Sequence, residues 1–167
     1  MTSHPPMRVG QGFDVHRHSD DPDRVLVLGG CVFDGAPGLE GHSDADVAAH
    51  AVADALLGAA GLGDIGQHVP DTDPRWAGAD SLRLLRHVAE LVRASGWVIS
   101  NVDVKIVCEA PKLSPMIGAM QQNLSAAAGA PVTVAGRRAE GLGAIGRHEG
   151  IAAWSVALIV ADEVSST

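Results

Sequence analysis

Aromatic residues are scarce in this sequence: tyrosine is absent, and Phe, Trp and Tyr together make up 3% of the 167 residues. Such a core must be built mainly from Ala, Val, Leu and Ile, which favours close packing of helices and sheets over large apolar cavities. No apolar run reaches the roughly 18–20 residues that a transmembrane helix needs. The N-terminal segment contains no charged stretch followed by an apolar one, so we expect no secretory signal.

Cysteine and positive charge are also in short supply. Cys31 and Cys108 form no recognisable motif, which is typical of two reduced thiols rather than of a disulfide or a metal pair. We therefore expect a cytoplasmic protein. The formal net charge of −8 disfavours nucleic acid as a partner, because a phosphate backbone requires a basic surface. An anionic ligand would need local positive charge from a metal ion, a helix N-terminus or a few placed Arg and Lys side chains.

The remaining pattern predicts a single α+β domain over residues 1–167, with residues 1–6 as a flexible tail. Alternating or continuous apolar runs predict strands over residues 7–16, 97–108, 132–134 and 151–160, with a possible hairpin at 24–33. Helical patterns cover residues 44–60 and 79–95, and Ser114-Pro115 opens a third helix. The expected architecture is a mixed sheet of roughly four strands with helices packed on one face.

Two residues of the first strand could bind a metal. Asp14 and His16 are two positions apart, so their side chains point to the same face of a strand. A carboxylate beside an imidazole supplies two of the ligands of a typical zinc site, although a surface salt-linked pair has the same pattern. His50 could be the third ligand. Asp46, four residues earlier on the same helix face, could then hold its ring.

The start of that helix and the loop after it offer polar groups for an anion and for hydroxyls. Ser43 and Asp46 form a capping-box pattern, and His42 and Ser43 lie where a helix N-terminus gathers an anion. An ordinary capped helix with a half-buried histidine explains the same residues. The loop at 61–78 is rich in Gly, Asp and Pro, and its carboxylates either form turns or bind substrate hydroxyls.

Taken together, these segments resemble the family of 2-C-methyl-D-erythritol 2,4-cyclodiphosphate synthases of the non-mevalonate isoprenoid pathway. The resemblance runs from about Met7 to the last strand, with the motifs in matching order and spacing. The motifs that carry it are Gly12-Phe13-Asp14-Val15-His16, Gly41-His42-Ser43-Asp44-Ala45-Asp46-Val47 through His50, Gly61-Leu62-Gly63-Asp64-Ile65-Gly66, Pro70-Asp71-Thr72-Asp73-Pro74, Gly78-Ala79-Asp80-Ser81 and Ala110-Pro111-Lys112.

The resemblance implies a homotrimer, with its sheets around a threefold axis and its active sites between neighbouring subunits. It implies one Zn²⁺ per subunit on Asp14, His16 and His50, and a second divalent ion, Mg²⁺ or Mn²⁺, held by Glu140 on the diphosphate. The implied catalytic residues are His42, Asp64 and Glu140. The implied substrate-binding residues are Ser43 at the phosphates, Asp64, Ile65, Gly66 and Asp71 at the methylerythritol, Ala110, Pro111 and Lys112 at the cytidine, and Arg137, Arg138 and Arg147.

The implied reaction is an intramolecular phosphoryl transfer. The 2-phosphate of 4-diphosphocytidyl-2-C-methyl-D-erythritol 2-phosphate attacks the β-phosphorus, CMP leaves, and a cyclic diphosphate forms. The substrate supplies its own nucleophile, so no Ser-His-Asp or Cys-His set is needed. The protein must align the substrate and neutralise its charge.

One stretch departs from the family pattern. Arg137-Arg138-Ala139 stands where relatives usually carry three threonines before the glutamate, and Gly141 replaces a lysine. The two guanidiniums could grip phosphates bidentately in place of hydroxyls, could reshape the pocket, or could face solvent. The second interpretation leads to an alternative function: a paralogue with the same metal site and a different nucleotide-diphosphate substrate. A non-catalytic trimer that binds nucleotide or prenyl phosphates is a further alternative.

Overall fold

The computed structural model describes residues 6–70, 76 and 78–162. Its strands are β1 (Met7–Arg17), β2 (Val25–Leu28), β3 (Cys31–Pro37), β4 (Trp97–Val107), β5 (Val132–Arg137) and β6 (Gly150–Ala161). Its helices are α1 (Val47–Ala60), α2 (Ile65–His68), α3 (Ser81–Ala94), α4 (Ile117–Ala128) and α5 (Gly143–Gly146). The α+β class and the predicted long elements are confirmed, whereas the short helices α2 and α5 were not predicted.

The main sheet has four strands in the order β1-β6-β4-β5. β6 is antiparallel to β1 and to β4, whereas β4 and β5 run parallel, with α4 in the connection between them. The sheet is therefore mixed, as predicted. β2 and β3 form a separate hairpin. Its turn residues Gly29 and Gly30 both have positive φ, at 55° and 69°, a backbone that glycine adopts without steric cost.

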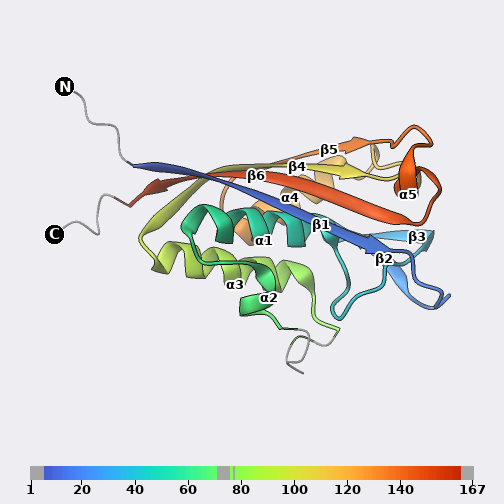
Figure 1. Cartoon of the computed structure of the whole chain (residues 1–167), viewed down its shortest axis with the longest axis horizontal. Helices are drawn as coiled ribbons and strands as arrows, with labels where there is room; N and C mark the ends of the chain where they lie inside the picture. Colours follow the sequence, from blue (N-terminus) through green and yellow to red (C-terminus); the bar gives the residue numbers. More distant parts are fainter. Residues whose placement is uncertain (1–5, 71–75, 77, 163–167) are drawn as a thin grey trace.

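Helices cover one face of this sheet. Figure 1 shows α1 lying along the sheet with α3 beneath it, and α4 on the same side. The interior combines small α1 residues such as Ala51 and Ala55 with branched strand residues such as Ile106 and Ile159, all fully buried. The scarcity of aromatics thus leads to the close packing that the composition predicts.

Two glycines set the distance between β1 and α1. A Cβ atom added at Gly10 would lie 2.0 Å from the carbonyl oxygen of Ala55, and one at Gly12 would lie 2.0 Å from that of Ala51. Both distances are far below van der Waals contact, so only glycine permits this approach of strand and helix. The approach brings Asp14 of β1 next to His50 of α1.

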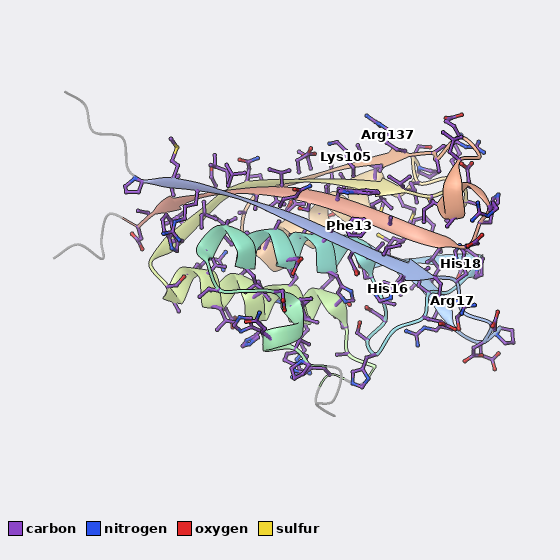
Figure 2. The ribbon with its side chains drawn as sticks, in the orientation of Figure 1. Phe13, His16, Arg17, His18, Lys105 and Arg137 are labelled. Carbon is purple, nitrogen blue, oxygen red and sulfur yellow. The ribbon has the colours of Figure 1, made fainter. Side chains whose placement is uncertain are left out.

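The opposite face of the sheet carries no helix among the described residues, and its β1 and β6 strands expose apolar side chains there (Figure 1). Its exposed side chains include Met7, Val9, Phe13, Val15, Trp154 and Val156. Phe13 and Trp154 are cross-strand neighbours with ring centroids 4.8 Å apart. Figure 2 shows Lys105 and Arg137 on this outer side and His16 on the helix side of β1.

Two predicted helix starts are wrong. α1 begins at Val47 rather than at residue 44, and its N-cap is Asp46 rather than Ser43. The buried Asp46 carboxylate accepts N–H groups from Ala48 and Ala49 of the helix, so the capping-box pattern was misread. The helix expected to open at Ser114-Pro115 begins at Ile117, after a turn and without a side-chain cap.

Candidate metal and substrate site

Three potential metal ligands converge at the contact between β1 and α1. Asp14 Oδ2 lies 3.1 Å from His16 Nε2 and 2.9 Å from His50 Nδ1. One donor atom from each residue lies within 4.8 Å of the others. Two imidazole nitrogens and one carboxylate oxygen are a donor set that could hold a divalent metal ion. The predicted grouping of these residues is confirmed.

The charges of this cluster favour a cation. Burial alone would raise the pKa of Asp14, but the close side-chain contacts with His16 and His50, together with the charges of these two residues, hold it well below its usual range. Burial alone would lower the pKa of His16, but the hydrogen bond and charge of Asp14 outweigh that effect and raise it. Asp14 therefore stays ionised, and its negative charge favours either a protonated histidine ring or a metal cation next to it.

His16 is oriented by the backbone. Its Nδ1 contacts the carbonyl oxygen of Glu40, which can only accept a hydrogen bond. Nδ1 therefore carries a hydrogen, and Nε2 is the ring nitrogen that faces Asp14. Backbone carbonyls commonly fix metal-binding histidines in this way.

His50 is not held by Asp46, and the prediction that it would be is wrong. The Asp46 carboxylate is occupied by four backbone N–H groups, which belong to Gly29, Gly30, Ala48 and Ala49. His50 Nε2 instead lies 2.9 Å from Ser81 Oγ and 3.2 Å from Ser43 Oγ. The sequence analysis assigned no role to Ser81. The feature that could have indicated one is its position in the Gly-Ala-Asp-Ser motif.

The cluster opens on a cavity of about 390 Å³. Its lining combines the three candidate ligands with Gly41, His42, Ser43, Ile65, Val69, Trp76 and Leu84. His42 is exposed and Ser43 is buried. The predicted catalytic residue His42 and the predicted substrate-binding residues Ser43 and Ile65 are therefore brought together with the metal cluster.

The predicted sugar-binding loop is only partly at this cavity. Asp64 caps α2, where its carboxylate accepts the Gln67 backbone N–H at 3.1 Å. Asp64 and Gly66 are exposed next to Ile65 but do not line the cavity. Asp71 and the rest of the 71–75 segment lie outside the described residues.

Asp54 anchors that loop and was missed by sequence reasoning. Its Oδ1 accepts the Ile65 backbone N–H at 3.1 Å. Burial raises the pKa of Asp54, although the Ile65 hydrogen bond opposes the increase. The available signal was spacing: Asp54 follows His50 by four residues and so lies on the same face of α1.

A second cavity of about 480 Å³ lies at the ends of β4 and β5. Pro111, Lys112, Arg137 and Arg138 are among its lining residues. The structure thus joins the predicted cytidine-binding segment to the arginine pair. Ala110 instead lines an adjoining cavity of about 270 Å³ with Pro111.

Like Asp64 and Gly66, the predicted residues Glu140 and Arg147 line none of these cavities. Glu140 is exposed and has a φ of 54°, in the left-handed region. Arg147 is exposed, and its Nε donates to Glu149 Oε1 at 2.6 Å.

The sequence from residue 7 to residue 160 matches the model of the YgbB family. The chain belongs to this family. A YgbB family relative from Bordetella petrii, the 2-C-methyl-D-erythritol 2,4-cyclodiphosphate synthase, is 54% identical over 157 residues, which cover 92% of this chain and 96% of the relative.

Solved structures that are similar to this chain agree with this assignment. The bifunctional IspDF protein of Campylobacter jejuni has a TM-score of 0.88 at 38% identity; the match covers 95% of this chain and 43% of that longer one. The IspF protein of Plasmodium falciparum in complex with CDP has a TM-score of 0.81 at 29% identity, covering 96% of this chain and all of that one.

The resemblance inferred from the motifs is therefore confirmed. The names of the YgbB family relatives support cyclodiphosphate synthase activity in isoprenoid biosynthesis, and the alternatives, a different nucleotide-diphosphate substrate or a non-catalytic role, are not favoured. Among the described residues, no helix is long and apolar enough to cross a membrane.

Proposed function

We propose that this chain converts 4-diphosphocytidyl-2-C-methyl-D-erythritol 2-phosphate into 2-C-methyl-D-erythritol 2,4-cyclodiphosphate and CMP. The observation that carries the proposal is the convergence of Asp14, His16 and His50 on a cavity that also contains His42 and Ser43. An oxygen of the 2-phosphate forms a new bond to the β-phosphorus. The bond from that phosphorus to the bridging oxygen breaks, and CMP leaves with the oxygen.

The proposed metals are one Zn²⁺ on Asp14, His16 and His50, and Mg²⁺ or Mn²⁺ with Glu140. When bound, such ions supply Lewis-acid charge neutralisation to the phosphates. The two-nitrogen, one-oxygen donor set supports zinc at the first site. The acidic net charge supports the need for both ions, because an acidic chain otherwise repels a polyanion.

The chain's own residues would align the substrate around these ions. We assign His42 and Ser43 to the phosphates, and Asp64 to the substrate hydroxyls, since a carboxylate accepts hydrogen bonds from two hydroxyl groups. The other substrate-binding residues that we propose are Ile65, Gly66, Asp71, Ala110, Pro111, Lys112, Arg137, Arg138 and Arg147. When both reacting groups are held in one cavity, the entropy needed to align them is lost on binding, which lowers the barrier of the chemical step.

A complete site would require a second copy of the chain. In the strand register, Asp14 of β1 pairs with Ala153 of β6. Ala153 pairs with Ile106 of β4, and Ile106 pairs with Gly136 of β5, so Asp14 and Gly136 lie in line across the sheet. β1 and β5 are its two edges, so the metal cluster and the arginine cavity are three strand spacings apart, roughly 14 Å. On the helix-bearing face of the sheet, α1 packs against β1, β6 and β4, and α4 packs against β5.

A cyclic assembly would bring the β1 edge of one copy against the β5 edge of the next and join the two half-sites. The exposed apolar outer face of the sheet supports this arrangement, because monomeric proteins rarely leave such a face in water. We therefore propose a homotrimer with its sheets around the axis. The two buried, unpaired cysteines support a cytoplasmic enzyme.

Turnover of the pure substrate tests the function. We expect the full chain with Zn²⁺ and Mg²⁺ to convert the substrate into CMP and the cyclic diphosphate. Phosphorus NMR measures the formation of both products. The His50→Ala variant should stay folded and trimeric but lose both zinc and turnover. A zinc-loaded trimeric protein that gives no product would refute the proposed reaction. Zinc retained at one equivalent per chain in the variant would remove His50 from the ligand set.

A further inference from the structure

A chain of hydrogen bonds runs from the candidate metal cluster into the start of α3. His50 Nε2 lies 2.9 Å from Ser81 Oγ, and Ser81 Oγ contacts Asp44 Oδ1. The other oxygen of Asp44 accepts the backbone N–H of Ser81 at 3.1 Å. Asp44 thus holds both the backbone and the side chain of Ser81, which is fully buried.

The Asp44 carboxylate determines the direction of these bonds. An ionised carboxylate has no hydrogen to give, so the single hydroxyl hydrogen of Ser81 must point to Asp44. Ser81 Oγ then presents only lone pairs to His50. Nε2, the ring nitrogen that lies 2.9 Å from it, can then form this hydrogen bond only by donating a hydrogen.

The surroundings of Ser81 agree with this direction. Ser43 Oγ accepts the Ala45 backbone N–H at 3.1 Å and lies 3.3 Å from Ser81 Oγ and 3.2 Å from His50 Nε2. When Nε2 carries the hydrogen, the hydroxyl hydrogen of Ser43 is available to Ser81. Ser81 would then accept from His50 and from Ser43 and donate to Asp44, which satisfies every bonding position of a hydroxyl. Burial increases the importance of such a satisfied network.

The consequence lies at the other ring nitrogen. With the hydrogen on Nε2, the neutral ring presents a lone pair at Nδ1, 2.9 Å from Asp14 Oδ2. Two lone pairs at this distance repel each other unless a cation lies between them. The ring would otherwise be free to place its hydrogen on Nδ1 and donate it to Asp14, which would block the metal position.

We propose that Ser81, held by Asp44, is a positioning residue that fixes the tautomer of His50 and so directs its Nδ1 lone pair to the metal site. This inference rests on the proposed metal-binding role of Asp14, His16 and His50. It adds a residue that touches neither metal nor substrate but determines whether His50 is ready to bind the ion.

Three variants of the full chain separate this role from simple packing. Ser81→Ala removes the acceptor. Asp44→Asn keeps the shape but adds an amide N–H, which can donate to Ser81 and let Ser81 donate to Nε2, reversing the chain. Ser155→Ala is the matched control, since Ser155 is 1% exposed and its hydroxyl has no partner among the described residues.

Two measurements test the effect of Ser81 on His50 without measuring enzyme activity. Zinc affinity is measured by competition with a chromophoric chelator, and the His50 tautomer by ¹⁵N NMR of the metal-free protein at a pH where the ring is neutral. We expect Ser81→Ala to weaken zinc binding by about tenfold or more and to populate the Nδ1–H tautomer. Asp44→Asn should shift the tautomer in the same direction, and Ser155→Ala should change neither.

Each outcome decides the inference. Wild-type zinc affinity together with an unchanged Nε2–H tautomer in Ser81→Ala would overturn it, as would an equal loss of affinity in Ser155→Ala. If Ser81→Ala does not fold, an unchanged tautomer in Asp44→Asn would overturn it instead. Failure of the wild-type protein to bind zinc would refute the proposed metal role, while the tautomer in the metal-free protein would still test the hydrogen-bond chain.

Discussion

Glu109 Oε2 accepts two hydrogen bonds from the Arg138 guanidinium, from Nε at 3.1 Å and from Nη2 at 2.9 Å. Its other oxygen accepts the Gly141 backbone N–H at 2.9 Å. Glu109 thus holds the turn on both sides of Glu140. Arg137 and Arg138 both line the larger cavity, and the Arg138 side chain is 68% exposed although it is paired with Glu109.

Two substitutions at Arg138 test whether it replaces a phosphate-binding hydroxyl. Both Arg138→Thr and Arg138→Ala lose the Glu109 ion pair, so the comparison between them isolates the hydroxyl. We expect Arg138→Thr to exceed Arg138→Ala in kcat/KM by about tenfold, the effect of one hydrogen bond to a charged group. Steady-state kinetics of CMP release measure it. Equal values for the two variants would contradict a role of position 138 at the phosphates.

The Glu109 interaction predicts a loss of stability in acid. The Gly141 N–H and the Arg138 guanidinium lower the pKa of Glu109 in the folded protein. An acid whose pKa is depressed by folding stabilises the protein above its unfolded pKa and loses that contribution as pH falls through the folded value. Glu109→Gln cannot titrate, so its urea midpoint should fall less steeply than that of the wild type below pH 4.5. Parallel curves for the two proteins would contradict the prediction.

Close contact between β1 and α1 predicts that Gly12 tolerates no side chain. In Gly12→Ala the new Cβ would meet the Ala51 carbonyl oxygen, so strand and helix must separate, and urea unfolding should show a loss of about 3 kcal/mol. Gly118→Ala is the matched control because nothing lies within 4 Å of its added Cβ; it should change stability by at most about 1 kcal/mol. An equally stable Gly12→Ala protein would refute the close approach.

The apolar outer face predicts the effect of a charge placed there. Trp154 is 40% exposed in the single chain, so Trp154→Asp should fold but fail to assemble. We expect a monomer by sedimentation, loss of turnover, and retained zinc, since the metal ligands belong to one chain. Val25→Asp is the control, because Val25 is 55% exposed on the separate hairpin. A trimeric, active Trp154→Asp protein would show that this face is not the interface.

Local sequence determined much of this site. The two-residue period of a strand was sufficient to put Asp14 and His16 on one side of β1. The α1 pattern supplied His50, and the order of the motifs identified the family. Each of these inferences depends on neighbours in the chain or on a recognisable pattern of residues.

The partners of these side chains were decided only by tertiary structure. Asp46 has the right spacing to hold His50, but the unpaired N–H groups of the buried Gly29-Gly30 turn compete for its carboxylate and take it. Because the Asp46 carboxylate is occupied, His50 contacts Ser81 instead, and this contact depends on how α3 packs against α1. Periodicity fixes the face on which a side chain lies. Which group it meets there depends on unsatisfied donors and acceptors brought in from distant elements, because a buried polar group must find a partner.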